Sequence, residues 1–237
     1  VCKDTLKECP SSCTLNGLQY QGQCVFRDKN YLVVDECYNG DQFCTAHCDC
    51  YAGFYGKDCS LDIDDYDSVR NTRQTMCVGL YRMLSLQDLT TDFVVSTVTN
   101  IVSTTLDPTQ LTHYGIGNCT ATFEAFVEQV PSIIASDDVV DSAFSALSNA
   151  WAFSTLPLNM SEPAEVLLEN EEFQNHMQSW VTDLTTRLAI ARQATLALGE
   201  AGTTVSLSGM RLYIFRQLSG AFINSDNSSV FSLPQNA

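Results

Sequence analysis

The 237-residue chain has few basic residues, and its lysines stop early. Lysine and arginine total 12 against 28 aspartates and glutamates, so the net charge is −16, and no lysine follows Lys57. Nucleic acids and anionic membrane surfaces are bound through clustered positive charge, so the composition argues against both as partners. No apolar run approaches the ~20 residues of a membrane-spanning helix, and we expect no membrane insertion in this segment.

Signatures of catalysis are also scarce. The chain has three histidines, His47, His113 and His176, and it lacks the H-E-x-x-H, G-x-S-x-G and P-loop motifs. Adjacent acids such as Asp137 and Asp138 point in different directions on a helix, which is typical of a solvated face. We therefore predict no catalytic residues, no enzyme activity and no cofactor. A hydrolase that uses His113 or His176 is kept as an alternative.

Cysteine, in contrast, is abundant at one end of the chain. Nine of the 11 cysteines lie within residues 1–59, and only Cys77 and Cys119 follow. So short a segment buries too little apolar surface to fold without crosslinks, so this density is typical of a disulfide scaffold. Disulfides persist in oxidising compartments, which predicts a secreted or cell-surface protein. Three N-x-S/T acceptors for N-linked glycans favour a eukaryotic secretory route, and they begin at Asn118, Asn159 and Asn227.

The most specific motif closes the cysteine-rich segment. Residues 48–59 read CDCYAGFYGKDC, which has the form C-x-C-x2-G-[FY]-x-G-x2-C. We expect Cys48 and Cys50 to face opposite sides of a strand, so that one bridges back to the start while the other closes the terminal turn. Gly53 and Gly56 supply turns with positive φ. The motif resembles the C-terminal half of an epidermal-growth-factor-like (EGF-like) module, and the CPSSC of residues 9–13 resembles a tenascin- or laminin-like start.

The resemblance implies a set of disulfides, with one departure from the family. The implied pairs are Cys9–Cys24, Cys13–Cys48 and Cys50–Cys59. The stretch between Cys24 and Cys48 is longer than usual and holds two more cysteines, which we pair across a loop as Cys37–Cys44. Sequence alone leaves other connectivities open. Cys2 is left over, with a preceding module, a neighbouring chain or the second module as the source of its partner.

Metal binding is the alternative use of these residue types. Cys44, His47, Cys48 and Cys50 are zinc-ligand residue types at short spacing, although glycan acceptors and the EGF-like pattern favour disulfides. Residues 3–8 carry two lysines and lack the tight acidic cluster that calcium needs. Residues 61–67 hold four aspartates, which either bind calcium or form a solvated linker whose last aspartate, Asp67, caps the next helix. We favour the linker.

Beyond residue 67 the apolar residues recur at helical spacing. Five stripes predict amphipathic helices that share a bundle-like core, crosslinked by Cys77–Cys119. We expect the third helix to end at Pro131, Pro163 to lie in the first turn of the last helix, and Gly199 to follow it as the C′ residue. The stripes are Cys77, Leu80, Tyr81 and Leu84; Phe93, Thr97, Val98 and Ile101; Phe123, Phe126, Val127 and Val130; Val140, Phe144, Leu147 and Trp151; and Phe173, Met177, Trp180, Leu184, Leu188, Ala191 and Leu198.

The last segment changes to strand patterning. Residues 203–207 and 210–215 predict strands, and 221–223 and 230–233 predict shorter ones. So few strands leave open edges that recruit further strands; the alternative is a small sheet protected on the helices. Helices followed by short strands over residues 68–234 resemble the start of the GAIN and REJ modules of adhesion receptors and polycystin-like proteins. The later cysteines and the His-Leu-Ser/Thr step of GAIN self-cleavage are missing, so autoproteolysis does not carry over.

We therefore predict an α+β protein. It comprises an EGF-like disulfide-rich module (1–60), an acidic linker (61–67), an α-helical domain (68–200) and a short C-terminal antiparallel sheet (201–237). The predicted function is a non-enzymatic extracellular structural or adhesive glycoprotein unit, such as a filament protomer, whose partners are other copies of itself or neighbouring modules. The alternative is an ectodomain fragment of a receptor or polycystin-like channel that acts in ligand or cell recognition. We interpret the chain as a mature chain or a piece of a longer one.

Overall fold

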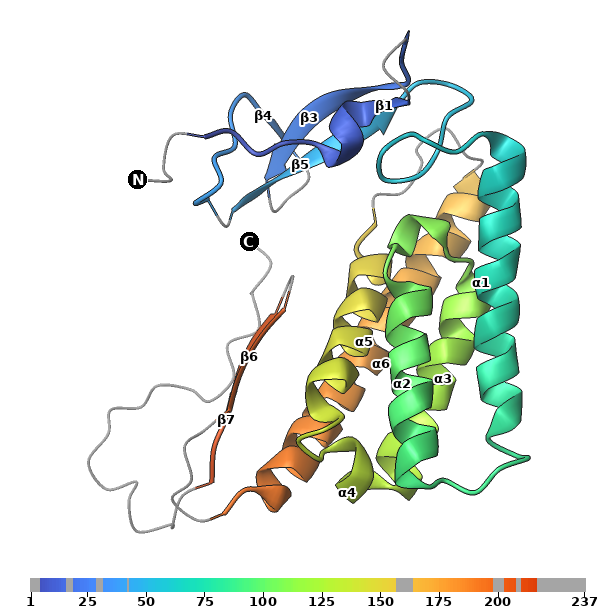
Figure 1. Cartoon of the computed structure of the whole chain (residues 1–237), viewed down its shortest axis with the longest axis vertical. Coiled ribbons are helices and arrows are strands. Elements are labelled where there is room, and N and C mark those ends of the chain that lie inside the picture. The colour runs from blue at the N-terminus through green and yellow to red at the C-terminus, as the bar shows by residue number, and fades with distance from the viewer. Residues whose placement is uncertain are drawn as a thin grey trace. The chain divides into compact units, whose positions relative to one another are not determined.

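The computed structural model describes residues 5–15, 19–28, 32–41, 43–156, 164–197, 203–207 and 210–216. The chain divides into two compact units, Val1–Thr72 and Arg73–Ala237. Both the cysteine-rich start and the later helices are visible in Figure 1. The mixed helix-and-sheet composition agrees with the predicted α+β class.

The first unit is held together by sulfur more than by apolar side chains. Its main sheet is antiparallel with the order β4-β3-β5, formed by β3 (Gly22–Asp28), β4 (Val33–Val34) and β5 (Cys44–Cys50). A short turn, η1 (Pro10–Cys13), and the pair β1 (Thr14–Leu15) and β2 (Gln19–Tyr20) complete it. Among the described residues of this unit, the buried apolar cluster is formed by cysteines, namely Cys9, Cys13 and Cys59, with Ala46 and Phe54 half-buried against it. The prediction of a disulfide-rich module is confirmed at this level.

Helix α1 (Ile63–Met83) begins earlier than expected. The backbone N–H of Tyr66 donates to the carbonyl of Asp62 at 2.9 Å, and the N–H of Asp65 donates to its Oδ1 at 2.9 Å. Asp62 is therefore the N-cap, and the prediction that Asp67 caps the helix is wrong. The acidic stretch that we assigned to a linker is mostly the first turn of α1, where carboxylates complement the helix dipole.

The second unit packs its helices around one apolar core. They are α2 (Thr91–Thr105), η2 (Pro108–Gln110), α3 (His113–Gln129), α4 (Pro131–Ile134), α5 (Val140–Ser154) and α6 (Ala164–Thr195). Thr90 and Thr112 cap α2 and α3 by accepting from the N–H groups of Phe93 and Gly115. Pro131 opens the short α4 as its first residue, a position where its missing N–H costs nothing.

Most predicted core positions are buried. Phe123, Phe126, Phe144, Met177 and Leu184 are at most 1% exposed. Tyr81 is the exception: it is 46% exposed, so its assignment to the core is wrong. The apolar stripe of α1 is narrower than we predicted, because Cys77 and Leu80 alone are buried on this helix. Within the described residues, no helix combines the length and apolarity that crossing a bilayer requires.

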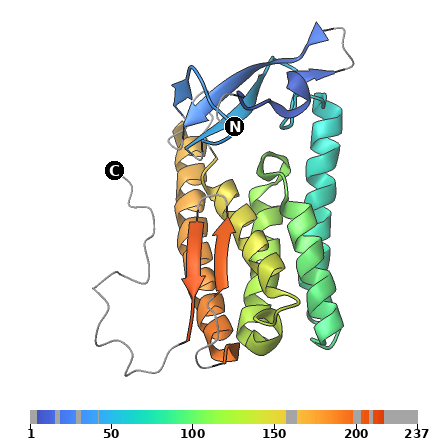
Figure 2. The same cartoon turned by 60° about the vertical axis from the view of Figure 1, so that its left-hand side comes forward.

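Two strands follow the helices, β6 (Thr203–Leu207) and β7 (Met210–Ile214), paired antiparallel with Val205 opposite Leu212. Figure 2 shows this sheet lying along α6. Val205 and Ile214 are buried in the helical core. The predicted strands 221–223 and 230–233 lie outside the described residues, as do Leu198 and Pro163.

The end of α6 differs from the prediction. The helix stops at Thr195, four residues before Gly199, so Gly199 is not its C′ residue; Gly199 itself lies outside the described residues. The side chain of Arg216 caps this end of the helix instead. Its guanidinium donates to the carbonyls of Ala194 and Leu196 at 3.2 and 3.1 Å, which satisfies acceptors that a helix end leaves unpaired.

Candidate functional site

The disulfides of the first unit clamp its start onto the sheet. Cys24 on β3 lies directly opposite Cys48 on β5, and the two bond to Cys9 and Cys13 respectively. The segment that contains η1 is thus crosslinked to two neighbouring strands. The remaining bridges are Cys37–Cys44 and Cys50–Cys59. These four pairs are the ones that the sequence analysis gave.

Our expectation that Cys48 and Cys50 face opposite sides of a strand is wrong. Residues i and i+2 of a strand share one face. On β5 the even positions 44, 46, 48 and 50 are buried or half-buried, while Thr45, His47 and Asp49 are exposed. Cys48 and Cys50 diverge along the strand instead: Cys48 joins the start of the module and Cys50 joins its end.

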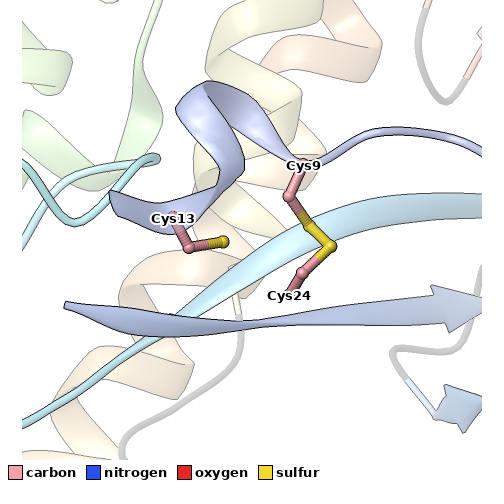
Figure 3. Close-up of side chains that lie close together, drawn as sticks. All are labelled: Cys9, Cys13 and Cys24. Carbon is pink, nitrogen blue, oxygen red and sulfur yellow. A yellow bond between two sulfur atoms is a disulfide. The ribbon is translucent and has the colours of Figure 1, made fainter. Parts of the chain in front are cut away.

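The closest grouping of metal-ligand atoms within the described residues is a set of sulfurs. Those of Cys9, Cys13 and Cys24 lie within 4.8 Å of one another (Figure 3). All three are bonded in disulfides, so they offer no thiolate, the form that ligates zinc. In the zinc set considered from sequence, Cys44, Cys48 and Cys50 are likewise bridged, and His47 lies on the opposite face of β5.

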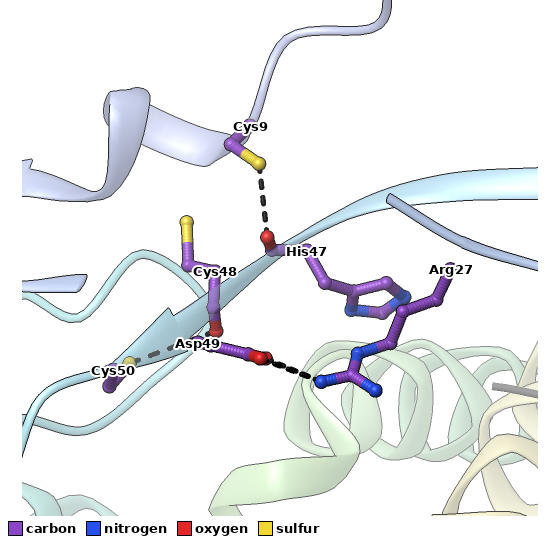
Figure 4. A network of polar contacts seen from close by, with 6 residues as sticks. All are labelled: Cys9, Arg27, His47, Cys48, Asp49 and Cys50. Carbon is purple, nitrogen blue, oxygen red and sulfur yellow. Dashed lines mark hydrogen bonds and ion pairs between the residues drawn. The ribbon is translucent and has the colours of Figure 1, made fainter. Parts of the chain in front are cut away.

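The exposed face of β5 carries a polar group (Figure 4). A guanidinium nitrogen of Arg27, on β3, donates to both carboxylate oxygens of Asp49 at 2.9 and 2.7 Å. The Nε2 of His47 lies 2.9 Å from the hydroxyl of Thr45. Burial, followed by the charge of Arg27, lowers the pKa of His47, while Asp49 opposes the shift. The lowered pKa favours the neutral form of the imidazole, and the ion pair beside it is partly open to solvent.

The other two histidines lie on the helices of the second unit. His113, at the start of α3, stacks on Phe173 with ring centroids 4.2 Å apart and meets the edge of Phe153 at 5.7 Å. Its ring therefore packs between side chains of α5 and α6. His176 on α6 is exposed, and its nearest aromatic ring is that of Trp180 at 5.9 Å.

The described residues of the long stretch between Cys24 and Cys48 include exposed apolar side chains. The ammonium group of Lys7 donates to the carbonyls of Asp41 and Cys44, both at 2.6 Å, and fastens this loop beside the Cys37–Cys44 bridge. Leu32, Val33 and Phe43 are 64%, 64% and 70% exposed. Sequence analysis missed this surface; its signal was the set of apolar residues inside a polar, cysteine-rich loop.

The first glycan acceptor lies inside a helix. The Nδ2 of Asn118, on α3, donates to the carbonyl of Tyr114 at 2.7 Å. The next residue, Cys119, is bonded to Cys77 of α1. The hydroxyl of Thr120, which is 4% exposed, contacts the Sδ of Met177 at 3.7 Å. Asn159, Asn227 and Cys2 lie outside the described residues.

The sheet β6–β7 is two-stranded as far as the structure describes it. Each strand therefore pairs on one side, and half of the backbone groups of each strand point away from the pair. The outer face presents Thr204 and Tyr213, which lie opposite each other; Thr204 is exposed and Tyr213 is 55% exposed. The inner face is fixed to the helices through Val205 and Ile214.

Comparisons with known proteins assign no family, since no family model, no curated protein and no solved structure matches this chain.

Proposed function

We propose that the chain is one unit of an extracellular structural or adhesive glycoprotein, which works by joining to other copies of itself without an enzymatic reaction or a cofactor. The observation that carries the proposal is the β6–β7 pair. It is anchored to a helical core on one face and has unpaired strand edges among the described residues. A rigid body that carries such an edge is suited to strand addition.

The first unit, in this proposal, is an EGF-like module with an elongated loop. Three of its bridges, Cys9–Cys24, Cys13–Cys48 and Cys50–Cys59, are those that the resemblance implies. The fourth, Cys37–Cys44, lies within the elongated loop. Crosslinks of this kind belong to oxidising compartments, which supports a secreted or cell-surface location.

The helices of the second unit form a bundle-like layer that presents the sheet edge. A strand supplied by a neighbouring copy would add main-chain hydrogen bonds to β6 or β7. If the donor and acceptor surfaces differ, the contact is heterologous, and repeated heterologous contacts that do not close into a ring generate a filament. The proposed product is thus a filament or surface appendage.

A charge placed at this edge tests the proposal. Lysine on an edge strand opposes strand addition, so Thr204→Lys is expected to reduce self-association at least tenfold in sedimentation velocity. Thr99→Lys, which adds the same charge at an exposed position of α2, is the matched control and should associate like the unmodified chain. A monomeric unmodified chain at high concentration, or equal association of both variants, would contradict the proposal.

A second candidate is recognition by an ectodomain fragment of a receptor or channel. It is favoured by Leu32, Val33 and Phe43, three apolar side chains of the elongated loop that are at least 64% exposed and that a partner could cover. Phe43→Asp would then abolish binding of the labelled chain to cells, while Leu86→Asp, at a site 78% exposed on the second unit, would not. Equal binding of both variants would count against this candidate.

A further inference from the structure

We infer that Asn118 can receive an N-linked glycan only before α3 forms and the Cys77–Cys119 disulfide closes. The glycan-transferring enzyme would then be unable to modify Asn118 in the folded protein. The inference rests on the secretory route of the proposed function, and it concerns the order of two covalent events on neighbouring residues.

Helix geometry separates the two groups that the acceptor must present together. The transferring enzyme engages the Asn amide and the hydroxyl two residues later in one extended segment. On an α-helix, residues i and i+2 point about 200° apart, since each residue turns about 100°. On α3, accordingly, Asn118 is half-buried with its amide on the Tyr114 carbonyl, while Thr120 is buried against Met177. The hydroxyl is inaccessible in the folded chain.

The disulfide holds Cys119, the middle residue of the acceptor, buried in its helical conformation. Cys119 has no exposed surface and is bonded to Cys77 with a Cα–Cα distance of 4.8 Å. The two helices are close along this line, because a Cβ on Gly115 would lie 3.2 Å from the Cα of Gln74. An extended conformation of residues 118–120 is incompatible with these contacts.

The modified side chain still fits the folded helix. In the transfer, a bond forms between Nδ2 of Asn118 and C1 of the sugar of a lipid-pyrophosphate-linked oligosaccharide. The C1–oxygen bond to the pyrophosphate breaks, the lipid pyrophosphate leaves, and Nδ2 loses one proton to a base of the enzyme. The second N–H remains and can donate to Tyr114, whose side chain is 61% exposed. The glycan therefore does not block later folding.

The two events fall on similar timescales. Met177 lies 57 residues after Thr120, so at about 5–20 residues per second it is synthesised roughly 3–11 s later. Cys77 is 42 residues earlier and is present when Cys119 emerges, and disulfides form in seconds or longer. Transfer to Asn118 must therefore be completed within seconds, before the neighbouring Cys119 bonds to Cys77.

The test uses the full chain, made oxidised and without glycans in a bacterial periplasm. It is incubated with purified oligosaccharyltransferase and lipid-linked oligosaccharide, either folded or unfolded in the presence of dithiothreitol. Mass spectrometry should find at least tenfold more glycan on Asn118 in the reduced, unfolded chain, and Asn118→Gln should remove that signal. Equal modification of the folded, oxidised chain would overturn the inference.

A separate readout distinguishes this result from failure of the secretory route. Protein from its native source is analysed for glycans at Asn118, Asn159 and Asn227. If all three are unmodified there, the proposed secretory function fails, while the in vitro difference between folded and unfolded chains would still uphold the order of events.

Discussion

Gly22 occupies a position in β3 where no side chain fits. A Cβ added there would lie 2.5 Å from the Sγ of Cys59 and 2.8 Å from the carbonyl oxygen of Asp49. The backbone of β3 thus approaches the Cys50–Cys59 bridge closely. Gly22 is required for space and not for its backbone angles, since the described glycines of this module with positive φ are Gly53 and Gly56.

Gly22→Ala is therefore expected to destabilise the module by about 1–3 kcal/mol, the usual cost of overpacking. Dithiothreitol should open Cys50–Cys59 faster in this variant, as followed by alkylation and mass spectrometry. Gly40→Ala is the matched control, because a Cβ at Gly40 meets nothing within 4 Å. Equal rates in the two variants would show that the close approach carries no energetic weight.

Asp58 joins the end of the module to its start by a hydrogen bond, and its ionisation makes the stability of the module depend on pH. Its carboxylate accepts from the hydroxyl of Ser11 at 3.1 Å and from the N–H of Ser60 at 3.2 Å. Burial raises the pKa of Asp58, but the hydrogen bonds from Ser60 and Ser11 outweigh burial and lower it. A carboxyl whose pKa is lower in the folded state contributes stability above its unfolded pKa of about 3.9, and loses it as pH falls through the folded pKa.

The urea midpoint of the module is thus expected to fall between about pH 5 and pH 2, and to fall less in Asp58→Asn. The asparagine keeps an acceptor for Ser60 but does not titrate. NMR signals of β5 would report the midpoint for this unit alone. Parallel pH curves for the two proteins would refute the role of Asp58.

At the scale of elements, caps decide where helices begin and end. Asp62→Ala should cost about 1 kcal/mol, the usual loss for an N-cap carboxylate, and should speed hydrogen exchange of the Asp65 amide, its partner. Asp67→Ala is the control: Asp67 is exposed and lies 4.0 Å from Arg70, an ion pair of little value. A larger effect at Asp67 would reinstate the cap that the sequence suggested.

Arg192 joins α6 to the end of α4, and it is almost fully buried. It is 8% exposed on α6, donates to the carbonyl of Ala135 just after α4 at 3.3 Å and pairs with Asp137. Arg192→Met should destabilise the second unit by about 1–3 kcal/mol, because the carbonyl of the buried Ala135 loses a charged donor. Arg187→Met removes a half-exposed arginine near Glu124, Glu128 and Asp183 and should cost under about 1 kcal/mol. Thermal unfolding followed by tryptophan fluorescence compares them, and an equal loss would contradict the distinction.

Sequence periodicity was sufficient to predict the five longer helices and β6–β7. The apolar faces of α2, α3, α5 and α6 are continuous and are buried against one another. The failures occurred where a local contact outweighs the pattern. Helix α1 begins at the cap formed by Asp62 and not at Asp67. At the end of α6, where a glycine was predicted, the side chain of Arg216 binds a free carbonyl. The placement of Phe43 depends on a contact that periodicity does not reveal, because Lys7, which is distant in sequence, binds the carbonyls of the nearby Asp41 and Cys44.

In the whole molecule, the net negative charge opposes self-association. Beyond residue 60 there are 7 basic and 20 acidic residues. Three of these arginines, Arg73, Arg192 and Arg216, donate to backbone carbonyls at or near helix ends. Identical acidic copies repel one another, and salt screens the repulsion over about 8 Å at physiological ionic strength. The proposed assembly should accordingly be favoured at about 0.15 M salt and weakened at low salt.

Negative-stain electron microscopy of the native, unreduced protein at physiological ionic strength shows whether copies of the chain assemble. We expect regular filaments with a constant repeat, which shorten or vanish in Thr204→Lys but persist in Thr99→Lys. Separate, uniform particles at every concentration would contradict this expectation and would leave recognition by the elongated loop as the function to pursue.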